Sequence, residues 1–144
     1  MKSVMIAPIV AILVAIPAFA SANDAIDKAA MEKGAVKTPS GMVYLSIKEG
    51  NGQSPSATST VVVDYRGTLT NGMEFDSSYN SKVYPSFPLS GVIPCWTEGL
   101  QMMKVGGKAK LVCPPELAYG SRGAGRDVPP NATLIFEVEL IRIE

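Results

Sequence analysis

The sequence has no histidine and only two cysteines among its 144 residues. Histidine is the usual general base at neutral pH and the commonest metal ligand, and two cysteines alone make a poor zinc site. Because Cys95 and Cys113 are not spaced as Cys-x-x-Cys, the pattern also argues against a redox enzyme. The composition therefore predicts no metal site, no cofactor and no chemistry that depends on an imidazole base.

An excess of charge of one sign is also missing. Lysine and arginine number 13, aspartate and glutamate number 13, and the formal net charge is +0. Proteins that bind nucleic acid or anionic lipid usually do so through clustered basic side chains, and no such cluster occurs along this chain. The sequence therefore predicts no nucleic-acid partner.

A long apolar run is the third absence. The apolar run over residues 4–16 is shorter than the roughly 18–20 residues that a membrane-spanning helix needs. It follows Lys2 and precedes small residues that include Ala20 and Ala22, which is the layout of a secretory signal peptide over residues 1–22. We expect cleavage after Ala20 or Ala22, and a periplasmic or secreted protein without membrane contact once the signal is removed.

The remaining chain has the length of one domain with one core. Residues 23–37 are predicted to be a short N-terminal helical segment, in which a helix over residues 23–33 ends before Gly34. Residues 38–144 form the predicted main domain. This helical segment is near the marginal length for an isolated helix.

Most of the main domain shows the two-residue period of half-buried strands. Val61, Val63 and Tyr65 share one face of a segment that starts at Thr60 and ends at the hairpin turn Asn71-Gly72. Further strands are predicted over residues 42–47, 73–75, 108–113 and 134–140. Residues 77–88 are predicted to be an irregular loop or a broken edge strand, and residues 114–131 a long loop rich in glycine and proline.

One amphipathic helix interrupts these strands. Pro94 suits its first position, while Trp96, Leu100 and Met103 lie on one face and Gly106 suits the stop. Strands around a single helix, without a strand-helix-strand repeat, predict an α+β fold built on an antiparallel sheet.

Five strings of residues resemble, in order, the successive blocks of FKBP-type peptidyl-prolyl cis-trans isomerases. They are Val-Asp-Tyr-Arg-Gly (63–67), Gly-Met-Glu-Phe-Asp-Ser-Ser (72–78), Val-Ile-Pro-Cys-Trp-Thr-Glu-Gly-Leu (92–100), Pro-Pro-Glu-Leu-Ala-Tyr-Gly (114–120) and Pro-Pro-Asn-Ala-Thr-Leu-Ile-Phe-Glu-Val-Glu-Leu (129–140). The resemblance covers residues 38–144 and is strongest to the bacterial secreted branch that includes Mip-like proteins. It implies a half-barrel of antiparallel β-sheet wrapped around one short α-helix. Larger secreted proteins that this chain resembles dimerise through a long N-terminal helical segment, and because the segment here is short, we expect a monomer.

The resemblance also implies the residues of an isomerase pocket. The implied catalytic residues are Asp76, Tyr119, Tyr65, Phe75, Ile93, Trp96 and Phe136. The implied substrate-binding residues are Val92, Pro85, Phe87 and Val128. In these roles the Ile93 amide and the Tyr119 hydroxyl hold substrate carbonyls, and Asp76 sits beside the twisting bond. The sequence departs from the family at three positions. Glycine is common at the position of Cys95, an aromatic or aliphatic wall residue at that of Pro85, and an apolar residue at that of Asp127.

Such a pocket suits the reaction because rotation about an X-Pro amide makes or breaks no bond. The barrier arises from lost C–N double-bond character, and the twisted carbonyl carries less charge than the planar one. An apolar pocket therefore binds the twisted state better than the flat state, which is catalysis by differential binding. The implied partners are X-Pro-containing polypeptides in folding, and macrolide inhibitors of the FKBP class.

Other interpretations remain beside this one. Taken singly, the aromatic residues could be core residues, and Asp76 could cap a turn through its carboxylate. Cys95 and Cys113 could pair in an oxidising compartment or remain buried thiols, since pairing requires Cα atoms closer than about 7 Å. The protein could instead be a chaperone that binds proline-containing segments with little turnover, or an interaction factor at the cell surface. Asn131-Ala132-Thr133 is a glycosylation sequon that matters only in a eukaryotic secretory route.

Overall fold

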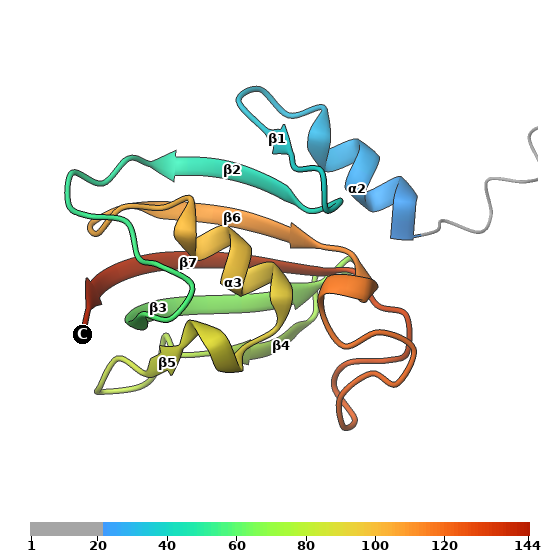
Figure 1. Ribbon diagram of the computed structural model, residues 1–144. Helices are drawn as coiled ribbons and strands as arrows, with labels where there is room; N and C mark the ends of the chain where they lie inside the picture. The colour runs from blue at the N-terminus through green and yellow to red at the C-terminus, as the bar shows by residue number, and fades with distance from the viewer. Residues whose placement is uncertain (1–21) are drawn as a thin grey trace, which may run out of the picture.

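The computed structural model describes residues 22–144, so nearly all of the predicted signal peptide lies outside the described residues. The described chain contains seven strands in one antiparallel sheet, in the order β1-β2-β6-β7-β3-β4, with β5 paired to the β4 side of β3 (Figure 1). The strands are β1 (Val36–Lys37), β2 (Val43–Lys48), β3 (Thr60–Leu69), β4 (Glu74–Ser77), β5 (Ser86–Pro88), β6 (Lys108–Cys113) and β7 (Leu134–Ile143). The predicted α+β fold with an antiparallel sheet is confirmed.

The helix α3 (Pro94–Gln101) lies across one face of this sheet (Figure 1). Pro94 starts it, as predicted, because a proline at the first helical position loses no hydrogen bond that the helix needs. The helix ends earlier than predicted. The amides of Met102 and Met103 donate to carbonyls three residues back, which tightens the last turn and ends the α geometry. Gly106, with φ of 93°, follows in the turn that leads into β6.

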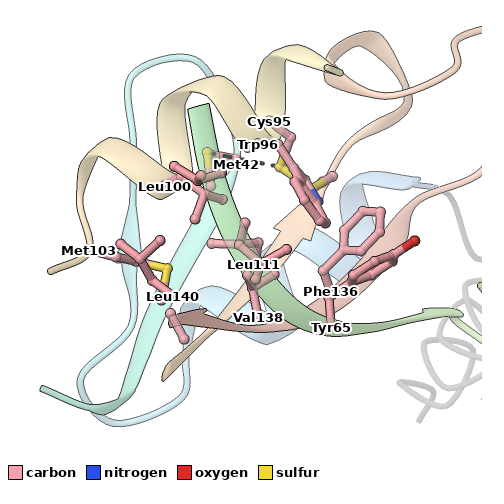
Figure 2. Close-up of a cluster of buried hydrophobic side chains, with 14 of the residues drawn as sticks. Met42, Tyr65, Cys95, Trp96, Leu100, Met103, Leu111, Phe136, Val138 and Leu140 are labelled. Carbon is pink, nitrogen blue, oxygen red and sulfur yellow. Dashed lines mark hydrogen bonds between the residues drawn. A yellow bond between two sulfur atoms is a disulfide. The ribbon is translucent and has the colours of Figure 1, made fainter. Parts of the chain in front are cut away.

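A single apolar core fills the space between α3 and the sheet. Alternate residues of β6 and β7 point into it, and Met103 remains buried there although it lies beyond the helix (Figure 2). The fully buried side chains include Met42, Leu100, Leu111, Val138 and Leu140. The predicted alternation is therefore confirmed, because the inward positions bury apolar side chains while the outward ones are mostly Lys and Glu, apart from Val112 and isoleucines of β7.

The opposite face of the sheet is partly covered by α2 (Ala22–Ala30). Ile26 and Ala29 pack there against Val43 and Val112, which explains why Val112 is buried although it points away from the main core. The helix was predicted to reach residue 33, but it ends at Ala30. The reason is the same as in α3, since the next two amides bond to carbonyls three residues back.

Residues 77–88 form a broken edge strand, one of the two predicted alternatives. The segment begins at the end of β4 and ends with β5, both of which pair with β3, and residues 78–85 connect the two strands. The 3-10 turn η3 (Leu89–Gly91) then leads into α3.

The long loop 114–131 begins with a second 3-10 turn, η4 (Pro115–Leu117), and carries a small hairpin between Ala124 and Val128. Within residues 22–144, no helix is long and apolar enough to cross a membrane.

Candidate active site

A cavity of about 520 Å³ opens between α3, the strands β3 to β5 and the loop after β6. Nine of the eleven residues that the resemblance implied for catalysis or substrate binding line it. They are Tyr65, Phe75, Asp76, Phe87, Val92, Ile93, Trp96, Tyr119 and Phe136. Gly91, Pro94 and Ala118 also line the cavity and were not anticipated. Residues that are up to 71 positions apart in the sequence thus meet at one site.

Trp96 is the centre of an aromatic cluster at this cavity. Its ring makes edge-to-face contacts with Tyr65 at 5.1 Å, with Phe136 at 5.4 Å and with Phe87 at 5.5 Å between ring centroids. Figure 2 shows the first two rings beside the indole, at the end of the core. Each such contact contributes about 0.5–1.5 kcal/mol beyond simple burial. The cluster is therefore a stiff apolar floor rather than a set of independent side chains.

Phe75 extends this floor from the edge strand, and Gly67 makes room for it. The rings of Phe75 and Phe136 lie 5.6 Å apart in edge-to-face geometry, over the Gly67 position of β3. A Cβ atom at Gly67 would lie 2.6 Å from Phe75 and 2.9 Å from Phe136. The glycine of the Tyr-Arg-Gly string is therefore required by side-chain packing and not by a turn.

Asp76 is the carboxylate at the cavity wall. The Tyr65 hydroxyl donates to its Oδ2 at 2.6 Å, and the Ser77 amide donates to its Oδ1 at 2.9 Å. Burial raises the pKa of Tyr65, and the hydrogen bond to Asp76 raises it further. Tyr65 therefore stays a neutral donor, and the carboxylate is held at the cavity. The Ser77 amide lies in the same strand β4 as Asp76, so this contact does not cap a turn.

Two donors at the cavity are free to bind a ligand. The Ile93 amide has no hydrogen-bond partner among the described residues, because Ile93 precedes the first turn of α3 and only its carbonyl is used by the helix. The Tyr119 hydroxyl also has no partner in the described part of the chain, and the side chain is 41% exposed. An apolar cavity with two free donors and one acceptor can orient the carbonyls of a bound peptide.

The structure does not bring Pro85 and Val128 to this cavity. Pro85 lies just before β5, where its carbonyl accepts a hydrogen bond from the Val63 amide at 3.1 Å. Phe87, which was also predicted, lies within β5, pairs with Val61 and lines the cavity. Val128 is buried in the core and lines a smaller, adjoining cavity together with Asp127.

Ser78 supports the site and was missed by sequence reasoning. Its hydroxyl donates to the Asp64 carboxylate and accepts from the Tyr65 amide at 2.8 Å, while its own amide donates to the Tyr65 carbonyl. These bonds fix the position of Tyr65 relative to β4. The Phe-Asp-Ser-Ser string contains the signal, but only the fold shows that its second serine is buried.

Cys95 and Cys113 form a disulfide in the structure, with Cα atoms 5.8 Å apart. The bond joins the start of α3 to the end of β6. Because Cys95 precedes Trp96 and Cys113 precedes the loop that carries Tyr119, the disulfide ties two walls of the cavity together. Of the two alternatives left open by the sequence, the structure has the paired form.

A curled antiparallel sheet over one short helix, with an aromatic cavity between them, defines the class of FKBP-like domains. A family model described as FKBP-type peptidyl-prolyl cis-trans isomerase matches residues 51–141. The chain belongs to this family.

The chain is similar to two bacterial proteins of this kind. It is 52% identical to "FKBP-type peptidyl-prolyl cis-trans isomerase FkpA" of Escherichia coli over 118 residues, which are 82% of this chain and 43% of that protein. The crystal structure of FkpA from Escherichia coli superposes with a TM-score of 0.82 at 50% identity, over 85% of this chain and 57% of that one. A peptidyl-prolyl cis-trans isomerase structure from Pseudomonas syringae pv. tomato gives a TM-score of 0.76 at 35% identity, over 85% of this chain and 93% of that one. The chain spans about half the length of the curated relatives that it matches.

Proposed function

We propose that this chain is an active peptidyl-prolyl cis-trans isomerase that accelerates X-Pro rotation in exported polypeptides during folding. The observation that carries the proposal is the meeting of an aromatic floor, a fixed carboxylate and two free donors at one cavity. Membership in the isomerase family supports the same activity.

The reaction needs only a change in the environment of one amide. The rotational barrier is about 18–20 kcal/mol, and unaided X-Pro isomerisation takes on the order of tens to hundreds of seconds. The proline ring stacks on Trp96, and the Ile93 amide and the Tyr119 hydroxyl donate to carbonyls that flank the rotating bond. The apolar walls strip water from the amide, which favours the less polar twisted state over the planar ones.

Asp76 then has an electrostatic and a positioning role. Its carboxylate faces the cavity while Tyr65 and the Ser77 amide hold it in place. We assign it to the neighbourhood of the rotating bond, where the carbonyl oxygen moves during the turn. Because no bond is made or broken, no nucleophile is required at this position.

A chromogenic peptide that contains one Xaa-Pro bond tests the proposal. The chain should raise the cis-to-trans rate above that in buffer, and Asp76→Ala and Tyr119→Phe should each lower kcat/KM about ten-fold, the equivalent of one lost hydrogen bond. Tyr84→Phe is the matched control, because Tyr84 is exposed and does not line the cavity. A wild-type rate equal to that in buffer would show the proposal to be wrong.

A second candidate function is that of a chaperone for unfolded chains. It is favoured by exposed apolar side chains in the connection between β4 and β5, where Tyr79 is 45%, Val83 78% and Tyr84 49% exposed. Contiguous exposed apolar side chains commonly mark binding surfaces. Suppression of client aggregation that persists in Asp76→Ala but falls in Val83→Ser would favour this function over isomerisation.

We further propose a monomer that is exported through the signal peptide over residues 1–22. The apolar side of α2 supports the monomer, because Ile26 and Ala29 are already buried on their own sheet. Light scattering should give the mass of one chain, and cell fractionation should recover the protein outside the cytoplasm. Macrolide inhibitors of the FKBP class should compete with peptide for the cavity, because the resemblance to the family implies that this apolar cavity binds them.

A further inference from the structure

A second cavity of about 170 Å³ adjoins the proposed active site. It shares Phe75, Asp76 and Tyr119 with the larger cavity, so the two form neighbouring compartments of one site. Ala124, Asp127 and Val128 complete its lining. The compartment is about the size of one large side chain.

The far wall of this compartment is an ordered hairpin. The Ala124 amide donates to the Val128 carbonyl at 2.9 Å, and the Val128 amide donates to the Ala124 carbonyl at 3.1 Å. Gly123, with φ of 69°, lets the two sides of the hairpin lie close together, because a Cβ atom there would be 2.4 Å from the Val128 carbonyl oxygen. Val128 itself is buried in the core. Asp127 is therefore carried on a wall that the core holds in place.

The charge of the two compartments has one sign. Asp76 and Asp127 are the only charged residues that line them, and neither forms an ion pair among the described residues. Arg122 and Arg126 lie on the same loop but line neither compartment. The smaller compartment thus combines apolar surface from Phe75 and Val128 with an unpaired carboxylate.

We propose that this compartment receives the side chain of the residue before proline, and that Asp127 makes the site prefer lysine or arginine there. The inference rests on the proposed isomerase function, in which Asp76 lies beside the X-Pro bond. Asp76 lines both compartments, so the side chain of the residue before proline can reach the smaller one. Long basic side chains lay an apolar stem along apolar surface and keep their charge at a polar rim, which matches the lining.

Peptides that differ only in the residue before proline test the inference. Lysine, norleucine and glutamate suffice, because norleucine has an apolar stem like that of lysine without its charge. In wild type, kcat/KM for the lysine peptide should exceed that for the norleucine peptide about three-fold to five-fold, as for one solvent-accessible charge pair. Asp127→Asn should bring this ratio close to one, whereas Arg126→Gln should retain it. High salt should also reduce the ratio in wild type.

Binding supplies a readout that does not require turnover. Trp96 is the only tryptophan in the chain and lies at the floor of the site, so its fluorescence reports peptide binding directly. The lysine peptide should bind more tightly than the norleucine peptide in wild type but not in Asp127→Asn.

The outcomes separate this inference from the function on which it rests. If every peptide isomerises faster than in buffer but wild type and Asp127→Asn give the same lysine-to-norleucine ratio, the inference is wrong and the isomerase function stands. A charge preference that appears only at the residue after proline would overturn it as well. If no peptide isomerises faster than in buffer, the proposed function fails, and the inference fails with it.

Discussion

The Tyr65 hydroxyl donates a hydrogen bond of 2.6 Å to Oδ2 of Asp76, and this bond joins the long strand β3 to the edge strand β4 inside the candidate site. The same Tyr65 ring contacts Trp96 at 5.1 Å. One side chain therefore couples the polar wall of the cavity to its apolar floor.

Tyr65→Phe isolates the polar half of this coupling. The phenylalanine ring keeps the contacts with Trp96 and Phe87, but Asp76 loses a donor. We expect the free energy of unfolding to fall by only about 1 kcal/mol, because water can replace the lost donor at the exposed Asp76 carboxylate. We expect kcat/KM to fall as well, because Tyr65 no longer holds this carboxylate in place. Denaturant unfolding and the peptide assay measure the two effects. Equal kcat/KM values for wild type and Tyr65→Phe would contradict the inference that Tyr65 positions Asp76.

The pKa of Tyr65 predicts how this bond responds to alkali. Burial, followed by the hydrogen bond to Asp76, raises the pKa of Tyr65 above the value of about 10 that applies to unfolded tyrosine. Because the pKa is raised, the stability that the neutral Tyr65 phenol contributes to the folded protein is fully present below about pH 10. This contribution is lost as the pH rises through the pKa of Tyr65 in the folded state. In an ultraviolet titration, folded wild type and Tyr65→Phe should therefore release the same number of phenolic protons up to about pH 11. An additional early-titrating tyrosine in wild type would contradict this.

Gly67→Ala tests the packing beneath the cavity. The new Cβ would lie 2.6 Å from Phe75 and 2.9 Å from Phe136, so at least one ring must move. We expect a loss of about 1–3 kcal/mol in stability and weaker peptide binding. Phe75→Leu removes part of the clash, so Gly67→Ala should cost less in that background than in wild type. Additive effects in this double-mutant cycle would show that the two sites do not interact.

The disulfide should stabilise the fold by restricting the unfolded chain. Cys95 and Cys113 are 18 positions apart, and closing a loop of this size contributes about 3 kcal/mol. A reductant should lower the denaturant midpoint of wild type but not that of a Cys95→Ala/Cys113→Ala variant. Because both residues are fully buried, a reductant should convert the disulfide to free thiols only after the chain has unfolded. Reduction of the disulfide in the native protein at neutral pH would contradict this.

The α2 helix should contribute stability without affecting the site. Ile26 is buried against the face of the sheet opposite the core that contains Trp96. Ile26→Ala should lower the free energy of unfolding by about 2 kcal/mol and leave kcat/KM unchanged. Met31→Ala is the control, because Met31 is 84% exposed and should change neither quantity. A large kinetic effect of Ile26→Ala would show that the two faces are coupled.

The fold class could be predicted from local patterns because side-chain direction in a strand alternates with every residue. This alternation identified β6 and β7, and Pro94 identified the start of α3. The ends of both helices were predicted too late. At Met103 the apolar spacing continues past the helix, since tertiary packing buries this side chain without helical geometry.

Most residues of the candidate site could be named from ordered strings that resemble a family, and nine of them lie at one cavity. Pro85 shows the limit of that reasoning. It lies just outside β5 with its carbonyl bonded to the Val63 amide, whereas Phe87 within β5 reaches the cavity. Register between strands is a long-range property that a single string does not contain.

The sequence by itself determined where the longer strands lie, where the central helix begins and which aromatic residues are available for an apolar site, because these depend on local periodicity and residue type. It did not reveal β1, a two-residue strand inside the predicted helical segment over residues 23–37. Only the tertiary structure decided that Cys95 meets Cys113, that Ser78 holds Tyr65, and that Asp127 lines a compartment beside Asp76. Those relationships depend on distances between residues far apart in the chain. Such distances are set by how the sheet curls over α3, which no local pattern encodes.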